Sequence, residues 1–125
     1  MDVNKICGII VPIVTPFTSD ERINQNELRR QVNRQIENGI HGIFCFGTNG
    51  EGYALNYDEK KLVLETVIDE VRGRVPVYAG TGCVTTRETL RESRMAQDVG
   101  ADALSVITPS FAVASHDEIY EHYRT

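Results

Sequence analysis

The chain has 125 residues, of which 41% are hydrophobic and 25% are charged, so its composition is that of a globular domain and excludes a disordered chain. Its 13 Lys and Arg against 18 Asp and Glu give a formal charge of -5, which disfavours nucleic acid or an anionic membrane as a partner. No apolar run reaches the roughly 20 residues that span a bilayer, and the Met1-Asp2-Val3 start does not resemble a signal peptide. We expect a single cytoplasmic domain.

Four short apolar runs lie along the chain, each without the polar alternation of a half-exposed strand. Runs of this kind are typical of strands that are buried on both faces of a parallel sheet. Pro12 interrupts the first run, and because proline lacks a backbone donor it favours a bulge or an edge strand there. The predicted strands are residues 9–14, 42–46, 75–79 and 103–107.

A helix N-cap pattern follows each apolar run, with a glutamate three residues after the cap. The cap side chain can accept from the amide three residues on, and the glutamate can return a bond to the cap amide. The caps recur about every 30 residues, the length of one strand–helix unit. They are Asn24, Asn56, Thr85 and Ser115.

The segments after these caps have helical periodicity, and Gly39, Gly73 and Gly100 are expected to end the first three helices. The fourth continues to the last residue, Thr125, with no stop signal, which suggests an interrupted chain. The expected buried faces are Leu28, Val32 and Ile36; Leu64, Val67, Ile68 and Val71; Leu90, Ser93, Ala96 and Val99; and Ile119, Tyr120 and Tyr123.

The fold class is therefore α/β, with four successive strand–helix units in residues 1–125 and no internal boundary. Two architectures fit this order: an open, doubly wound sheet and a segment of a (β/α)8 barrel. A complete barrel needs about 250 residues, so this chain could supply only half of one. Periodicity alone leaves both architectures open.

Ligands of either architecture bind beyond the C-terminal ends of the parallel strands. The loop Gly47-Thr48-Asn49-Gly50-Glu51-Gly52 is the most informative there, because its glycines can aim backbone amides at an anion while Thr48 and Asn49 add side-chain donors. That chemistry suits a small carboxylate. The spacing is neither a dinucleotide fingerprint nor a P-loop. The alternative is a glycine-rich turn that merely joins a strand to a helix.

Other candidate groups give weaker signals. The cysteines are expected to be buried, reduced thiols, and Lys60 and Lys61 to be surface charges at the start of the second helix. A phosphoacceptor receiver domain would need an aspartate at the end of a central strand, where this chain has Thr, Gly and Pro. No metal-ligand spacing joins Cys7, Cys45 and Cys83 to His41, His116 and His122.

The strand-end motifs together resemble the dihydrodipicolinate synthase and N-acetylneuraminate lyase family, over the whole chain and in the family's order. Residues 8–17 are similar to the family's first strand, and Gly47-Thr48-Asn49-Gly50-Glu51 is similar to its G-[ST]-x-G-E signature. Residues 75–82 and 106–109 are similar to its third and fourth strands. The resemblance implies a (β/α)8 TIM barrel, of which this chain supplies the first four units.

The family's chemistry is a lysine Schiff base with pyruvate or a related 2-oxo acid, and the resemblance implies no cofactor and no metal. Thr48 falls on the hydroxyl that contacts the substrate carboxylate and relays a proton, and Asn49 on a carboxylate-holding position. Ser110 and Phe111 replace two aromatic residues, the second a relay tyrosine. We expect Thr48 to be catalytic and Thr48, Asn49 and Phe111 to bind substrate; the missing hydroxyl of Phe111 favours a lyase, aldolase or dehydratase over a strict synthase.

The Schiff-base lysine of the family comes from the sixth strand, beyond the end of this chain. The lysines present, Lys5, Lys60 and Lys61, lie at no predicted strand end. We therefore expect the isolated chain to be inactive and to form no Schiff base with pyruvate. The alternative is a non-catalytic half-barrel or a small-carboxylate binding module. The expected partners are a small 2-oxo acid and either a second copy, in a homo-oligomer, or the missing C-terminal half-barrel.

Overall fold

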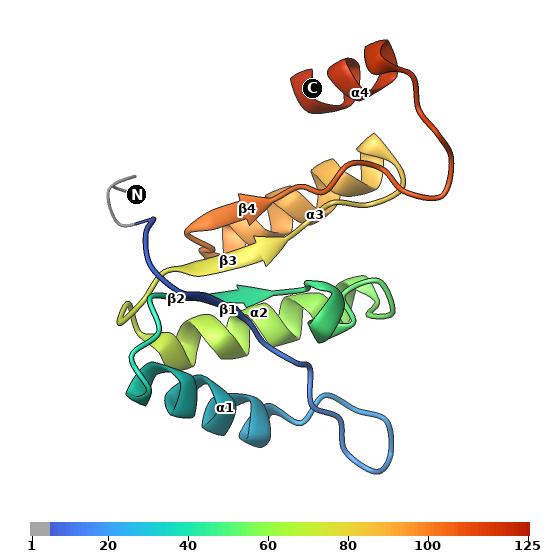
Figure 1. The fold of residues 1–125 in the computed structure, drawn as a ribbon. Helices are drawn as coiled ribbons and strands as arrows, with labels where there is room; N and C mark the ends of the chain where they lie inside the picture. Colours follow the sequence, from blue (N-terminus) through green and yellow to red (C-terminus); the bar gives the residue numbers. More distant parts are fainter. Residues whose placement is uncertain (1–5) are drawn as a thin grey trace.

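The computed structural model describes residues 6–125, which form one sheet of four parallel strands in the order β1-β2-β3-β4 (Figure 1). The expected succession of four strand–helix units is confirmed. Met1-Asp2-Val3 and Lys5 lie outside the described residues. The elements are β1 (Ile10–Pro12), α1 (Gln25–Glu37), β2 (Gly42–Cys45), the 3-10 turn η2 (Thr48–Gly50), α2 (Tyr57–Val71), β3 (Val77–Gly80), α3 (Thr86–Val99), β4 (Ala103–Ser105) and α4 (His116–Arg124).

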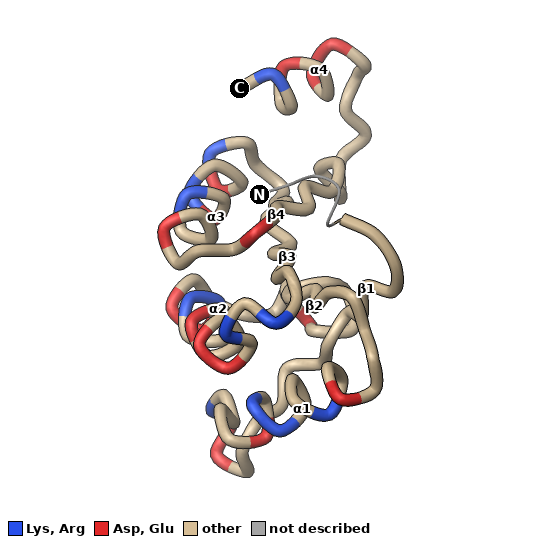
Figure 2. The backbone as a smooth tube through the Cα atoms, turned by 90° about the vertical axis from the view of Figure 1, so that its left-hand side faces the viewer, with Lys and Arg blue, Asp and Glu red and all other residues tan. Residues whose placement is uncertain are grey.

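The two faces of the sheet have different environments. Helices α1, α2 and α3 lie along one face (Figure 2), where Ile43 and Val77 face each other across β2 and β3 and are almost fully buried. The other face carries the row Pro12, Phe44, Tyr78 and Ala103, one residue from each strand. No helix of residues 6–125 covers this second face (Figure 2). The hydrophobic core therefore lies between the sheet and one layer of helices.

Pro12 lies in an edge strand, as its missing donor predicted, because β1 pairs with β2 alone among the described strands. The amide of Val14, two residues further on, donates to the side-chain oxygen of Gln31 at 3.1 Å. Helix α1 thus satisfies a donor that the end of β1 leaves unpaired.

All four predicted N-caps are confirmed, with each side chain accepting from the predicted amide. Helices α2 and α4 have complete capping boxes, in which Glu59 and Glu118 also accept from the cap amide. Those bonds lower the pKa of the Glu118 carboxyl. Gly39 and Gly100 follow α1 and α3 with positive φ, whereas α2 already turns left-handed at Arg72, one residue before Gly73.

The predicted buried faces are confirmed for α1 and α2 but are partly wrong for α3 and α4. In α3, Ala96 is buried as expected, but Leu90, Ser93 and Val99 are only partly buried, while Thr89, Glu92 and Met95 are buried, with Glu92 paired to Lys60 of α2. In α4 only His122 is buried, while Tyr120 and Tyr123 stay exposed. The three cysteines are free as expected, but of them only Cys45 is fully buried, and burial raises its pKa to about 12.

Helix α4 is attached through two polar contacts rather than an apolar face. The Nδ1 atom of His122 lies 2.8 Å from the hydroxyl of Thr86 at the start of α3, and the Tyr123 hydroxyl donates to the carbonyl of Val106 at 3.1 Å. Figure 1 shows α4 above the N-terminal end of α3, away from the layer formed by the other three helices. None of the helices in residues 6–125 is long and apolar enough to cross a membrane.

An ion-pair network joins α1 to α2 on the solvent side. The Arg29 guanidinium contacts the carboxylates of Asp69 and Glu70, and Glu70 also accepts from the Asn33 amide at 2.8 Å. The hydrogen bond from Arg29 is the main reason that the pKa of Glu70 lies below its ordinary value. The folded chain therefore favours the ionised form of Glu70.

Glu70→Gln should lower the free energy of unfolding at pH 7 by more than Glu65→Gln, which removes only an exposed pairing with Lys61. Because the folded-state pKa of Glu70 is lowered, its contribution is complete above the ordinary value of 4.5 and disappears as the pH falls through the lowered value. Urea unfolding of both variants and the wild type at pH 7 and pH 3 checks this. An equal loss from Glu70→Gln at both pH values would contradict it.

Candidate functional site

The loop between β2 and α2 turns sharply as soon as the strand ends. Phe46 has a φ of 67°, a left-handed conformation that is uncommon outside glycine, and it redirects the chain into η2. The amides of Gly50 and Gly52 bond to the carbonyl of Gly47 within this loop. The amides of Thr48 and Asn49, in contrast, have no hydrogen-bond partner among residues 6–125. Two adjacent backbone donors are thus left free at the strand end.

Glycines let this loop fold back against the end of its own strand. A Cβ atom at Gly52 would lie 2.4 Å from the Phe46 carbonyl oxygen, and one at Gly80 would lie 2.9 Å from the same oxygen. A Cβ at Gly50 would lie 2.8 Å from the carbonyl oxygen of Ile13. Real Cβ atoms do not come this close to backbone oxygens, so each position requires glycine or a displaced backbone.

Thr15 fixes the loop to the end of the first strand. Its buried hydroxyl donates to the carbonyl of Gly50 at 2.7 Å. Nothing in the sequence indicated a bond between these two residues. This bond holds η2 at the C-terminal edge of the sheet, as the sequence predicted for this loop.

A cavity of about 710 Å³ opens beside this loop, and we call it the strand-end cavity. Its walls come from the ends of β2, β3 and β4, from the loops that follow them and from the start of α2. Phe44 contributes an apolar surface, and Thr48 and Ser110 contribute hydroxyls. A pocket of this size, largely apolar with a few polar groups, suits a small molecule.

The structure brings together two of the three predicted substrate-binding residues. Thr48 borders the strand-end cavity, and Asn49 is its exposed neighbour on η2 but does not line the cavity. Phe111 lies in the loop after β4 with a φ of 82° and is fully exposed outside the cavity. The roles assigned to these three residues stay predictions.

Lys60 is not the surface charge that its sequence position predicted. It is only 8% exposed, it lines the strand-end cavity, and its ammonium lies 3.1 Å from the carboxylate of Glu92 on α3. Lys61, in contrast, is half exposed as expected. Lys60 stands one and two helical turns before Leu64 and Val67 on the buried face of α2, so the helical periodicity could have revealed its position. Nothing in the sequence pairs it with Glu92.

Cys83 lines the same cavity, near Lys60. Burial raises the pKa of its thiol, and the positive charge of Lys60 offsets part of that rise. The Cys83 amide is held by the hydroxyl of Thr89 at 3.0 Å. The thiol is therefore mainly protonated at neutral pH and is a poor nucleophile. No group of three or more His, Cys, Asp or Glu side chains in residues 6–125 could hold a metal ion.

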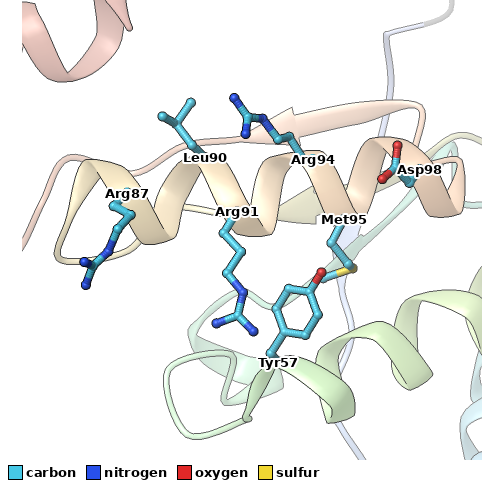
Figure 3. Close-up of a pocket in the computed structure, with 7 residues that line it drawn as sticks. All are labelled: Tyr57, Arg87, Leu90, Arg91, Arg94, Met95 and Asp98. Carbon is cyan, nitrogen blue, oxygen red and sulfur yellow. The ribbon is translucent and has the colours of Figure 1, made fainter.

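A second, more open groove of about 600 Å³ lies between α2 and α3 (Figure 3). The Arg91 guanidinium stacks 4.0 Å above the centre of the Tyr57 ring there, with Arg87 on the same side of α3, while Leu90 and Arg94, which also line the groove, extend from the opposite side of the helix (Figure 3). The Arg91 guanidinium therefore already covers the Tyr57 ring, which is the one aromatic surface of the groove. The strand-end cavity, which has hydroxyls and a buried cation on its wall and the free amides of η2 next to it, is the stronger candidate.

The whole described chain is similar to one protein family. The dihydrodipicolinate synthetase family matches residues 5–125. The chain is 46% identical over 117 residues to 4-hydroxy-tetrahydrodipicolinate synthase of Pelobacter propionicus and 42% identical over 120 residues to that of Methanopyrus kandleri. These alignments cover 94% and 95% of this chain but 40% of each relative, so the chain spans well under half of their length.

Two solved structures have the same fold over this length, each with a TM-score of 0.92. Chloride-inhibited dihydrodipicolinate synthase from Acinetobacter baumannii, complexed with pyruvate, is 36% identical and aligns with 95% of this chain and 41% of its own. The prophage protein YagE from E. coli K12, of the same family and also complexed with pyruvate, is 34% identical. Its alignment covers 95% of this chain and 40% of YagE. Such relatives are TIM barrels, so the four units form an N-terminal half-barrel rather than an open sheet.

Gly52→Ala should destabilise the chain by about 1–3 kcal/mol, the usual cost of forcing a methyl group into a packed site. Gly47→Ala is the matched control, because its Cβ would meet only the ring of Phe44, at 3.2 Å, and its φ of -70° suits any residue. Urea unfolding of both variants measures the difference. An equal decrease in the free energy of unfolding for the two variants would contradict the close approach of the loop to Phe46.

Proposed function

Because the chain belongs to the dihydrodipicolinate synthetase family, we propose that it is the carboxylate-binding half of an aldolase-type lyase that acts on pyruvate or a related 2-oxo acid. The observation that carries this proposal is the pair of free amides at Thr48 and Asn49, next to the strand-end cavity. The pyruvate complexes of the two similar barrels support the substrate class.

In this proposal, η2 binds the substrate carboxylate and fixes its orientation. Two backbone donors, the Thr48 hydroxyl and the Asn49 side-chain amide lie within one turn, where they can donate to the two oxygens of a carboxylate. The glycines and Thr15 hold this turn rigid, so little ordering is needed on binding. The carbonyl next to the carboxylate is then presented to the interior of the barrel.

The Thr48 hydroxyl can also move a proton while the carbonyl reacts. A relay needs a second hydroxyl, and Phe111 has none at the position where synthases of the family carry a tyrosine. Ser110 lines the strand-end cavity and supplies a hydroxyl one residue earlier. This departure supports a lyase, aldolase or dehydratase reaction over a strict synthase reaction.

The covalent step requires a lysine that lies beyond residue 125 in the family. Lys60 and Lys61 both lie on α2 rather than on a strand, and Lys60, which lines the strand-end cavity, is paired with Glu92. Residues 1–125 are thus proposed to be the N-terminal half of one TIM-barrel domain, inactive alone. A non-catalytic carboxylate-binding module is the second candidate, and the same absence of a strand-end lysine among the described residues favours it.

The open edges of the sheet support a partner. Ile9 and Val14 next to β1, and Leu104 and Ile107 in or after β4, are between 43% and 68% exposed. Apolar side chains at unpaired parallel edges favour association. We propose that the C-terminal half-barrel or a second copy of the chain covers these side chains. We also propose that the enzyme is cytoplasmic.

Thr48→Val in the full-length enzyme should keep the fold and reduce turnover by about 10²–10⁴-fold, the usual contribution of one proton-transfer group. Thr48→Ser is the matched control, because it retains the hydroxyl and should retain most of the activity. Steady-state kinetics with pyruvate as substrate measures both variants. Near wild-type turnover in Thr48→Val would remove Thr48 from the mechanism.

A further inference from the structure

Lys60 is a buried amine on the wall of the strand-end cavity with a single counter-charge. Its side chain is 10% exposed, that of Glu92 is 8% exposed, and the two charged groups are 3.1 Å apart. No other acid is paired with Lys60 among residues 6–125. The proposed function makes no use of this pair, which comes from two different helices.

We propose that Lys60 is a masked carbonyl-reactive amine, held as an unreactive ammonium by Glu92, and that small aldehydes and 2-oxo acids in the cavity are its reactants. Lys60 is not the Schiff-base lysine that the family resemblance implies, because that lysine lies on a strand beyond residue 125. The inference does not depend on carboxylate binding by η2.

The balance between burial and pairing is the physical basis of this masking. A lysine with so little solvent contact can carry a positive charge only if a neighbouring charge compensates the lost hydration. Glu92 provides that compensation. Without it, the buried positive charge has no compensating partner, which favours the neutral amine relative to the wild type, and a neutral, desolvated lysine is the form that attacks carbonyl carbon.

The adjacent thiol is a weaker competitor for the same reactants. Cys83 also lines the cavity, but burial raises its pKa, so it is mostly an unreactive thiol at neutral pH. Removing the negative charge of Glu92 would help the thiol only slightly, because burial is the larger cause of the raised pKa. Lys60 is therefore the group whose reactivity depends on Glu92.

The reaction is an ordinary imine condensation. The neutral Lys60 nitrogen attacks the carbonyl carbon, a C–N bond forms, and the carbonyl π electrons move to the oxygen. Transfer of protons from nitrogen to oxygen gives a carbinolamine and then releases water, leaving the imine. Added borohydride delivers hydride to the imine carbon and traps a stable secondary amine.

The test compares two charge-removing variants on the same pair of helices. Glu92→Gln removes the buried counter-charge, and Glu65→Gln removes the exposed carboxylate that pairs with Lys61 at 3.8 Å. Each variant, the wild type and the double variant Lys60→Arg/Glu92→Gln are incubated at pH 7 with propionaldehyde or with pyruvate, and then reduced with borohydride. Peptide mapping separates adducts at Lys60 from those at Lys5 and Lys61.

We expect Glu92→Gln to carry at least about tenfold more Lys60 adduct than the wild type, since labelling follows the fraction of neutral amine. Glu65→Gln should resemble the wild type, and the double variant should lose the adduct at position 60. Equal labelling of Lys60 in the wild type and Glu92→Gln overturns the masking. A folded Glu92→Gln without a Lys60 adduct overturns the reactivity.

Circular dichroism establishes that Glu92→Gln is folded, and Glu92→Met, which fills the same space without charge, replaces it if it is not. The two probes separate this inference from the proposed function. Labelling of Lys60 by uncharged propionaldehyde supports the inference whether or not η2 binds carboxylates.

Discussion

The position of the Phe46 carbonyl determines the geometry of the candidate site. This oxygen lies against both Gly52 and Gly80, so the loop after β2 and the end of β3 pack directly, backbone to backbone. Any side chain at either position would separate the two segments. Phe46 itself adopts a left-handed conformation, which the surrounding packing must stabilise. Strand ends, loop and cavity wall are thus fixed together.

A rigid backbone at this point has a direct chemical consequence. η2 uses the amide of Gly50 internally and leaves those of Thr48 and Asn49 without a partner among residues 6–125, so the two free donors belong to a turn that cannot easily rearrange. Preorganised donors bind an anion without an ordering cost. Phe46 and Leu55, on either side of the loop, belong to the apolar core between the sheet and the helices. The hydrogen bond from Thr15 connects the loop to the end of β1.

The sequence predicted the features that depend on local interactions. Helix caps, the succession of strand–helix units and the strand-end loops are encoded within a few residues, and they agree with the structure. The burial of Lys60 was mispredicted although it shares the buried face of α2 with Leu64 and Val67, and its partner Glu92 could not be predicted because it lies far away in sequence on another helix. The attachment of α4 through His122, rather than through Tyr120 and Tyr123, likewise depends on a hydroxyl from α3. Periodicity carries no information about such partners.

Carboxylate recognition by η2 is the central claim, and nuclear magnetic resonance of the isolated chain tests it most directly. Addition of pyruvate should shift the ¹H–¹⁵N signals of Thr48 and Asn49, whose amides are free, while those of Gly39 and Gly100, at remote helix ends, stay unchanged. Pyruvamide, which has the same carbonyl but no carboxylate, should leave all four signals in place. Equal shifts with both compounds, or pyruvate-induced shifts confined to other residues, would contradict the account.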